Sequence, residues 1–288
     1  MNVYEYATII SSKIENTSVR EVTKANGVVL TGISLKVTNS SGLTIEPTVY
    51  VDGYYNDNVE IEKATEMIRK TFEEAATENI DISFYTDYEQ VKKHLTVALF
   101  NQSCKAQFPV NRSAKSYGFS DLIIVPKVTV YSNGEPLGSI TVTEKHVTAW
   151  GVTKATVIND ALKNSENDFQ ILSIEQALCH EEGAVCAEEI ESYTLDHFEV
   201  PFIVITNRRF VNGASAVLSK KLKANLERIF REFGGYSLIP SSVHEMIAVP
   251  LMPENTGMID AMIPAVNDEK VQAQEVLGTH AYLFKIAD

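Results

Sequence analysis

A hydroxyl, an imidazole and a carboxylate follow one another in the segment Pro240-Ser241-Ser242-Val243-His244-Glu245. Nucleophilic and acid–base sites are built from these three groups. If a strand begins at Val243, however, His244 and Glu245 point to opposite faces of its sheet and cannot form one relay unaided. Ser242 also lacks the Gly-x-Ser-x-Gly surroundings of a nucleophile elbow. The segment therefore favours a structural corner, in which a serine bonds local backbone and His244 or Glu245 pairs with the connection 205–213.

The alternative interpretation of the same residues is catalytic. A hydrolase or transferase would be centred on Ser242, His244 and Asn207, with Glu245 beside them. Such an enzyme must place at least two of these polar groups in one concave pocket, whereas a binding protein exposes an apolar patch. The neighbouring pair Arg208-Arg209 could bind an anion, although such pairs are more often simply exposed.

Metal-ligating residue types gather at Cys179-His180-Glu181-Glu182, with Cys186 and His197 farther along the chain. The seven-residue step between the two cysteines matches no zinc knuckle, and a fourth ligand is missing. His146 and Trp150 lie four residues apart and would share a helix face, which favours packing. No glycine-rich nucleotide-binding loop occurs. We therefore expect neither a metal nor another cofactor.

Composition restricts the class of partner. The chain has 288 residues, 44% of them hydrophobic, and a formal net charge of −13. This charge repels phosphate backbones and anionic lipids, so we expect a protein or a small ligand as partner and neither nucleic acid nor a membrane. A second alternative is an acidic mimic of nucleic acid. The three cysteines show no framework spacing and no secretion signal precedes them, which predicts a cytoplasmic protein with unbridged thiols.

Three Asn-Gly pairs mark tight connections, at Asn26-Gly27, Asn133-Gly134 and Asn212-Gly213. A type I′ turn needs positive φ at both central residues, so each pair predicts a hairpin between antiparallel strands. Helices are predicted from three- and four-residue apolar steps over 3–14, 59–78, 87–100, 153–162, 174–180, 220–233 and 258–266. Strands are predicted over 28–37, 43–51, 80–84, 122–131, 137–142, 202–206, 214–218, 236–239, 243–249 and 280–286.

These elements predict an α+β fold, with mixed or antiparallel sheets built from hairpin–helix units in two lobes. The hairpin–helix units are unequally spaced and differ in sequence, which argues against a repeated module. We expect an N-terminal α+β lobe over 1–165 and a C-terminal α+β lobe over 201–288. The carboxylate-rich stretch 166–200 is predicted to be an acidic linker or lid.

Several stretches together give the chain a resemblance to a known family. They are 26–32 (NGVVLTG), 46–50 (EPTVY), 119–122 (FSDL), 150–153 (WGVT), 205–207 (ITN), 213–218 (GASAVL) and 238–245 (LIPSSVHE). As a set they resemble an uncharacterised bacterial domain-of-unknown-function family found mainly in anaerobic gut-type bacteria. The resemblance implies a bacterial cytoplasmic protein and association with a mobile element, and it carries no established activity. Our expectation is a non-enzymatic module that binds a protein or another ligand.

Overall fold

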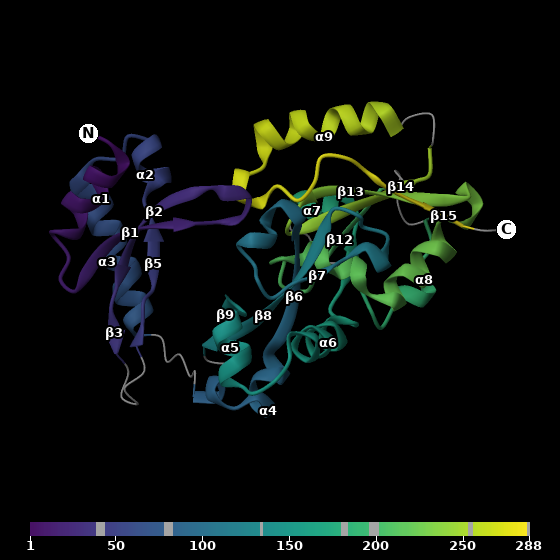
Figure 1. Cartoon of the computed structure of the whole chain (residues 1–288). Coiled ribbons are helices and arrows are strands. Elements are labelled where there is room, and N and C mark those ends of the chain that lie inside the picture. Colours follow the sequence, from purple (N-terminus) through teal and green to yellow (C-terminus); the bar gives the residue numbers. More distant parts are fainter. Residues whose placement is uncertain are drawn as a thin grey trace. The chain divides into compact units, whose positions relative to one another are not determined.

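The computed structural model describes residues 1–38, 44–77, 83–132, 135–179, 184–195, 202–252 and 256–286. Helices and sheets are both abundant, and every strand pair whose register is described is antiparallel. The predicted α+β class is therefore confirmed. The chain forms two compact units, one of residues 1–81 with 132–135 and one of residues 82–131 with 136–288 (Figure 1).

The smaller unit is built on a three-stranded antiparallel sheet in the order β1-β2-β5. Its first helix begins with a capping box, because the Asn2 side chain accepts the Glu5 N–H and the Glu5 carboxylate accepts the Asn2 N–H. The elements of this unit are α1 (Val3–Ser11), β1 (Thr17–Thr23), β2 (Val29–Leu35), β3 (Val37–Thr38), β4 (Thr44–Ile45), β5 (Thr48–Tyr50), α2 (Asp52–Asn56) and α3 (Ile61–Thr77).

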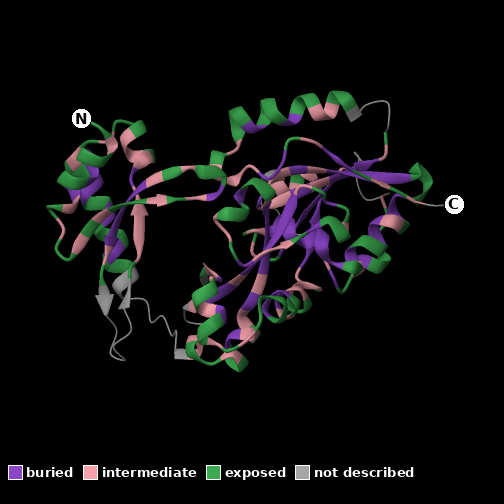
Figure 2. Cartoon of the chain, viewed as in Figure 1, coloured by how far each residue is buried: buried purple, intermediate pink, exposed green. Residues whose placement is uncertain are grey.

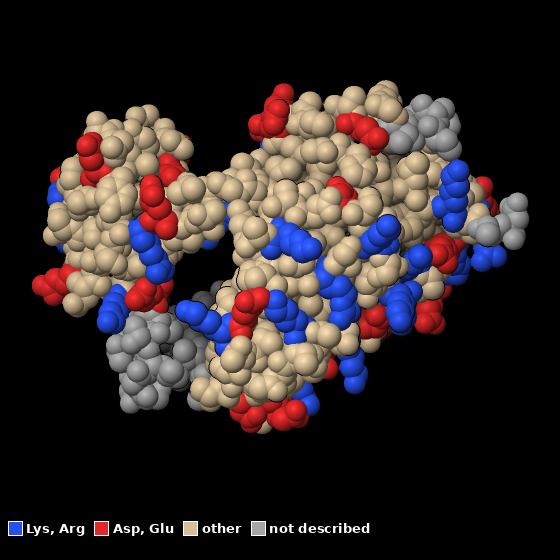
Figure 3. Space-filling model, in the orientation of Figure 1, with Lys and Arg blue, Asp and Glu red and all other residues tan. Residues whose placement is uncertain are grey.

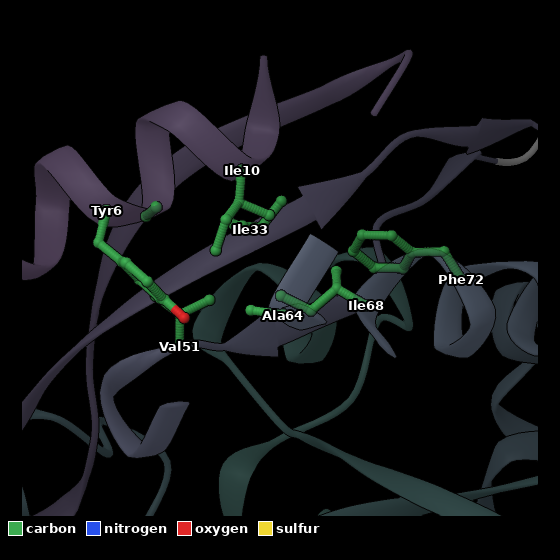
Figure 4. Close-up of a cluster of buried hydrophobic side chains, with 8 residues drawn as sticks. Tyr6, Ile10, Ile33, Val51, Ala64, Ile68 and Phe72 are labelled. Atoms are coloured by element: carbon green, nitrogen blue, oxygen red, sulfur yellow. The ribbon is translucent and has the colours of Figure 1, made fainter. Parts of the chain in front are cut away.

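The core of this unit lies between the sheet and its helices. Ile10 of α1, Ile33 of β2 and Ile68 of α3 are fully buried in one cluster, and Figure 4 shows their side chains converging. Tyr6 packs in the same cluster and donates its hydroxyl to the Val59 carbonyl at 2.8 Å. The apolar steps of the helices and the buried Ile33 of β2 therefore meet in one core.

The turn at Asn26-Gly27 joins β1 to β2, which pair in antiparallel register. Asn26 and Gly27 have φ of 60° and 73°, as a type I′ turn requires, and the Val28 N–H donates to the Ala25 carbonyl. This hairpin is confirmed. The second predicted turn, Asn133-Gly134, lies outside the described residues, although β8 and β9 on either side of it pair.

The larger unit holds a six-stranded sheet in the order β11-β10-β12-β14-β13-β15 and a sheet in which β8 pairs with β6, β7 and β9. The strands are β6 (Leu95–Asn101), β7 (Arg112–Ser113), β8 (Leu122–Ser132), β9 (Glu135–Thr141), β10 (Gln170–Leu172), β11 (Val185–Cys186), β12 (Ile203–Thr206), β13 (Gly235–Ser242), β14 (Glu245–Pro250) and β15 (Tyr282–Lys285). The α-helices are α4 (Tyr88–Val91), α5 (Glu144–Ala149), α6 (Lys154–Ser165), α7 (Ile174–Cys179), α8 (Lys220–Ile229) and α9 (Thr256–Lys270).

One predicted element near residue 90 is wrong, and another lies mostly outside the described residues. The helix expected over 87–100 ends at Val91, and Leu95–Asn101 forms strand β6, paired with β8 from end to end. This run is buried on both faces, and such a run lacks the alternation that separates a strand from a buried helix. The strand expected over 80–84 begins outside the described residues, and Ser83–Thr86 is a 3₁₀ helix.

The third predicted hairpin is also wrong. Asn212 has a left-handed φ of 56°, but it starts a 3₁₀ helix over Gly213–Leu218 where a strand was expected. A Cβ atom on Gly213 would lie 2.6 Å or less from Thr206, His244 and Asn207, so only glycine fits. The Asn-Gly pair therefore serves a close backbone approach rather than a hairpin.

The predicted acidic linker, 166–200, contains part of the larger sheet. β10 pairs with β12 through Ile171 and Ile205 and with the short β11 on its other side. Asp168, just before β10, forms an ion pair with Arg209 at 2.9 Å. The compact units divide near residue 81 instead of near 166, so the lobe boundaries differ from those expected.

Candidate functional site

The segment Ser241–Glu245 forms the tip of the β13–β14 hairpin. Ser242 pairs with Glu245 in the ladder, so Val243 and His244 are the two turn residues. The strand begins two residues later than predicted. The Val243 N–H donates to the Glu275 carbonyl at 2.9 Å, which fixes the tip to the segment after α9.

The His244 side chain lies at this corner between two neighbours. Its Nδ1 accepts the backbone N–H of Asn212 at 3.2 Å, and its Nε2 lies 3.6 Å from a carboxylate oxygen of Glu275. Because Nδ1 accepts a hydrogen bond, the tautomer that fits this geometry carries its proton on Nε2. Ser242 Oγ accepts the backbone N–H of His244 at 3.0 Å. The hydrogen bonds expected of a structural corner are therefore present.

Asn207 is buried at the centre of the connection that packs against this corner. Its side-chain oxygen accepts the N–H groups of Arg209 and Val211, and its amide nitrogen donates to the Val211 carbonyl at 2.9 Å. Gln170 donates to its backbone carbonyl. The side chain thus shapes the loop, and its hydrogen bonds go to Arg209 and Val211 instead of to His244 or Ser242.

The two arginines beside Asn207 each hold a carboxylate. Arg208 binds both oxygens of Glu188 at 2.7 Å, and Arg209 donates to Asp168 and to the Thr129 hydroxyl. Arg209 also lines a cavity of about 110 Å³. Because both guanidinium groups already pair with carboxylates, neither favours an added anion.

The metal candidates can be placed only in part. His180, Glu181, Glu182 and His197 lie outside the described residues, and no metal-binding cluster occurs among the residues that are described. Within the same part of the chain, Cys104 is buried and Cys186 half-buried, and neither is in a disulfide.

His146 and Trp150 pack together, as their spacing predicted. Their ring centroids lie 5.7 Å apart, and the Trp150 indole N–H donates to the Tyr85 carbonyl at 2.8 Å. His146 Nδ1 accepts the Thr143 N–H and lies 3.2 Å from the Tyr85 hydroxyl. Burial lowers the pKa of His146 below its ordinary value, because desolvation disfavours the charged ring.

A separate feature of the larger unit is an apolar groove beside α9. Ile239 of β13 and Ile247 of β14 are register partners and share one sheet face, here called the groove face. α9 lies over this face (Figure 1), and the space between them has a volume of about 370 Å³. We call it the α9 groove. Its lining residues are Phe202, Ile239, Pro240, Ser241, Ile247, Val249, Met252, Met258, Ile259, Met262, Ile263, Val266 and Asn267.

The α9 groove is open because α9 is held at only a few points. Among the α9 side chains described, only Ile263 and Asn267 are buried, and Figure 2 shows most of the helix as exposed. Asn267 donates to the Gly278 carbonyl at 3.0 Å, and Asp260 accepts the Ala281 N–H at 2.8 Å. Pro264 interrupts the hydrogen bonds within the helix.

Exposed apolar side chains mark this groove. Met258, Met262 and Val266 recur every four residues and are 60%, 55% and 49% exposed. Met252, Met258 and Met262, called the groove methionines below, are three of the chain's six methionines. Their clustering within eleven residues was a visible signal, but the sequence could not show that the helix leaves them uncovered.

None of the described residues that line the α9 groove is charged, and none of Ser242, His244 and Asn207 lines it or the smaller cavity. The groove can therefore take an uncharged group by apolar contact, since flexible methionines adapt to varied shapes. Ser241 and Asn267 are its polar contacts. The described lining residues provide binding surface and contain no nucleophile–base pair.

Comparisons with known proteins place nearly the whole chain in one family. A model of a family of unknown function matches residues 4–285. Searches of the curated proteins and of the solved structures found no match. In the described part of the chain, the helices are too short or too polar to cross a membrane.

Proposed function

Because the chain belongs to the family of unknown function DUF5688, which carries no activity with it, we propose a function from geometry: the protein binds the apolar part of a small ligand in the α9 groove. The uncovered methionines support this function most directly. Burying them against a ligand removes apolar surface from water at about 25 cal/mol per Å². A volume of about 370 Å³ lies in the range of small-molecule sites, roughly 300–1,000 Å³.

The catalytic alternative has less support. His244 Nδ1 is occupied by the Asn212 N–H, and Ser242 Oγ accepts a backbone N–H, so neither side chain is poised toward the other. A serine nucleophile needs a base within hydrogen-bond reach.

No observation of the structure specifically supports the second alternative, an acidic mimic of nucleic acid. A cytoplasmic location and a mobile-element association stay predictions from the sequence.

The dye Nile red, which is uncharged and fluoresces in apolar surroundings, tests the proposal. We expect saturable binding to the intact chain, with affinity lowered about tenfold or more by Met262→Glu. The new carboxylate would have to be desolvated beside the ligand. Met262 is exposed, so we expect the variant to fold normally.

Ala265→Glu provides the matched control. Ala265 is exposed on the same helix, does not line the groove, and receives the same charge. We expect dye affinity within about twofold of the parent, because surface charges away from a site change binding little. No saturable dye binding by the parent, or equal losses in both variants, would refute a ligand site in the groove.

A further inference from the structure

We infer that the ligand of the α9 groove is an amphiphile with a cationic head: an alkyl or aryl amine whose ammonium group lies at the Glu245 end. This inference rests on the proposed function and names the class of ligand. Its basis is a carboxylate at the end of a groove whose described lining residues are all uncharged.

Glu245 lies on the groove face. Side chains alternate along β14, so Glu245 shares its face with Ile247 and Val249, which both line the groove. Ser241, which lines the groove from β13, donates its hydroxyl to a carboxylate oxygen of Glu245 at 2.9 Å. The apolar floor therefore ends in a serine–carboxylate pair at the hairpin tip.

The Glu245 carboxylate is half-buried, and no cation among the described residues forms an ion pair with it. The adjacent His244 ring accepts the Asn212 N–H and lies beside Glu275, and no ion pair joins it to Glu245. Removing a carboxylate from water costs free energy unless it is hydrogen-bonded or paired, and an ion pair would add to the hydrogen bond from Ser241. Here a ligand can supply the positive partner.

An amine satisfies both parts of this arrangement. Its ammonium group can donate to the carboxylate and to the Ser241 oxygen, while its hydrocarbon covers the groove methionines. An anionic head would meet Glu245 with like charge, in a chain whose net charge is −13. A neutral head would gain neither attraction nor repulsion. Among ligands with the same hydrocarbon chain, an amine should therefore bind most tightly, an alcohol less tightly and a carboxylate least tightly.

Three probes with the same chain length test this order: 1-octylamine, 1-octanol and octanoate, each displacing Nile red at about pH 7, where the amine and the acid are ionised. We expect octylamine to bind about tenfold more tightly than octanoate, with octanol between them. Glu245→Gln keeps the acceptor for Ser241 and removes the charge, so the three affinities should converge to within about twofold.

Glu269→Gln serves as the control, because it removes the same charge from an exposed position of α9 that does not line the groove. The order of the probes should survive in it. Equal affinities in the parent, tighter binding of octanoate, or an unchanged order in Glu245→Gln would overturn the cationic ligand while leaving an apolar site intact. Failure of octanol and Nile red to bind at all would overturn the proposed function itself.

Discussion

His244 joins two connections at the β13–β14 corner. Its ring accepts the Asn212 N–H, and its backbone carbonyl accepts the Thr206 hydroxyl at 2.8 Å. Ser242 closes the turn from the other side by accepting the His244 N–H. These hydrogen bonds stabilise the folded chain and form no catalytic relay. Their contribution can be measured as a free energy of unfolding.

We expect His244→Ala to lower the free energy of unfolding by about 1–3 kcal/mol, because the Asn212 N–H loses its acceptor. His244→Phe, which preserves bulk but not the acceptor, should lose a similar amount. Ser242→Ala should cost about 1 kcal/mol. Chemical denaturation gives all three values. Losses below about 0.5 kcal/mol for both alanine variants would contradict the structural role and favour a test for hydrolysis.

The second prediction for a single residue concerns His146 and the dependence of the free energy of unfolding on pH. Burial lowers the pKa of its folded state, so the native chain binds fewer protons than the unfolded chain. Stability should be retained above the unfolded pKa of about 6.5 and decline as the pH falls through the lower folded pKa. Unfolding followed by fluorescence of Trp150, the only tryptophan, measures this decline.

His146→Asn is the comparison for that titration. The asparagine oxygen can accept the Thr143 N–H, as Nδ1 does, but it does not gain a proton in this range. The difference between parent and variant isolates the histidine from carboxylates that titrate at lower pH. Parallel stability curves between about pH 7 and 5 would show that His146 is not a desolvated base.

At the scale of elements, periodicity predicted the long helices, including α3, α6 and α9, because their apolar residues recur on one face. It failed for β6, whose apolar run is buried on both sides. Turn chemistry identified Asn26-Gly27 correctly and failed at Asn212-Gly213, where the crowding around Gly213 arises from distant segments. A sequence pattern thus predicts an element correctly only where interactions between neighbouring residues determine its conformation.

The same limit explains the candidate site. The hydrogen bonds of the β13–β14 corner could be anticipated because they join residues close to a strand end. The α9 groove could not, since it depends on how α9 is held above the sheet by Asp260, Ile263 and Asn267. A methionine-rich amphipathic helix is compatible with either a closed core or an open groove.

At the scale of the whole molecule, charge is distributed unevenly. Figure 3 shows lysine and arginine side chains gathered over the middle of the larger unit, although the chain carries a net charge of −13. The surface along α9 shows few charged side chains in the same view. On the face shown, the surface beside the proposed ligand site therefore differs in charge from the middle of the larger unit.

Methyl NMR of the methionines is the most direct test of ligand binding in the α9 groove. With ¹³C-methyl methionine and added 1-octanol, we predict saturable shifts of the three groove methionines. Met1 and Met67 are exposed outside the groove and report non-specific contact, and Met246 is buried on the opposite sheet face. These three signals should stay in place. Shifts of equal size at Met1 and Met67, or unmoved groove methionines, would contradict a ligand site beside α9.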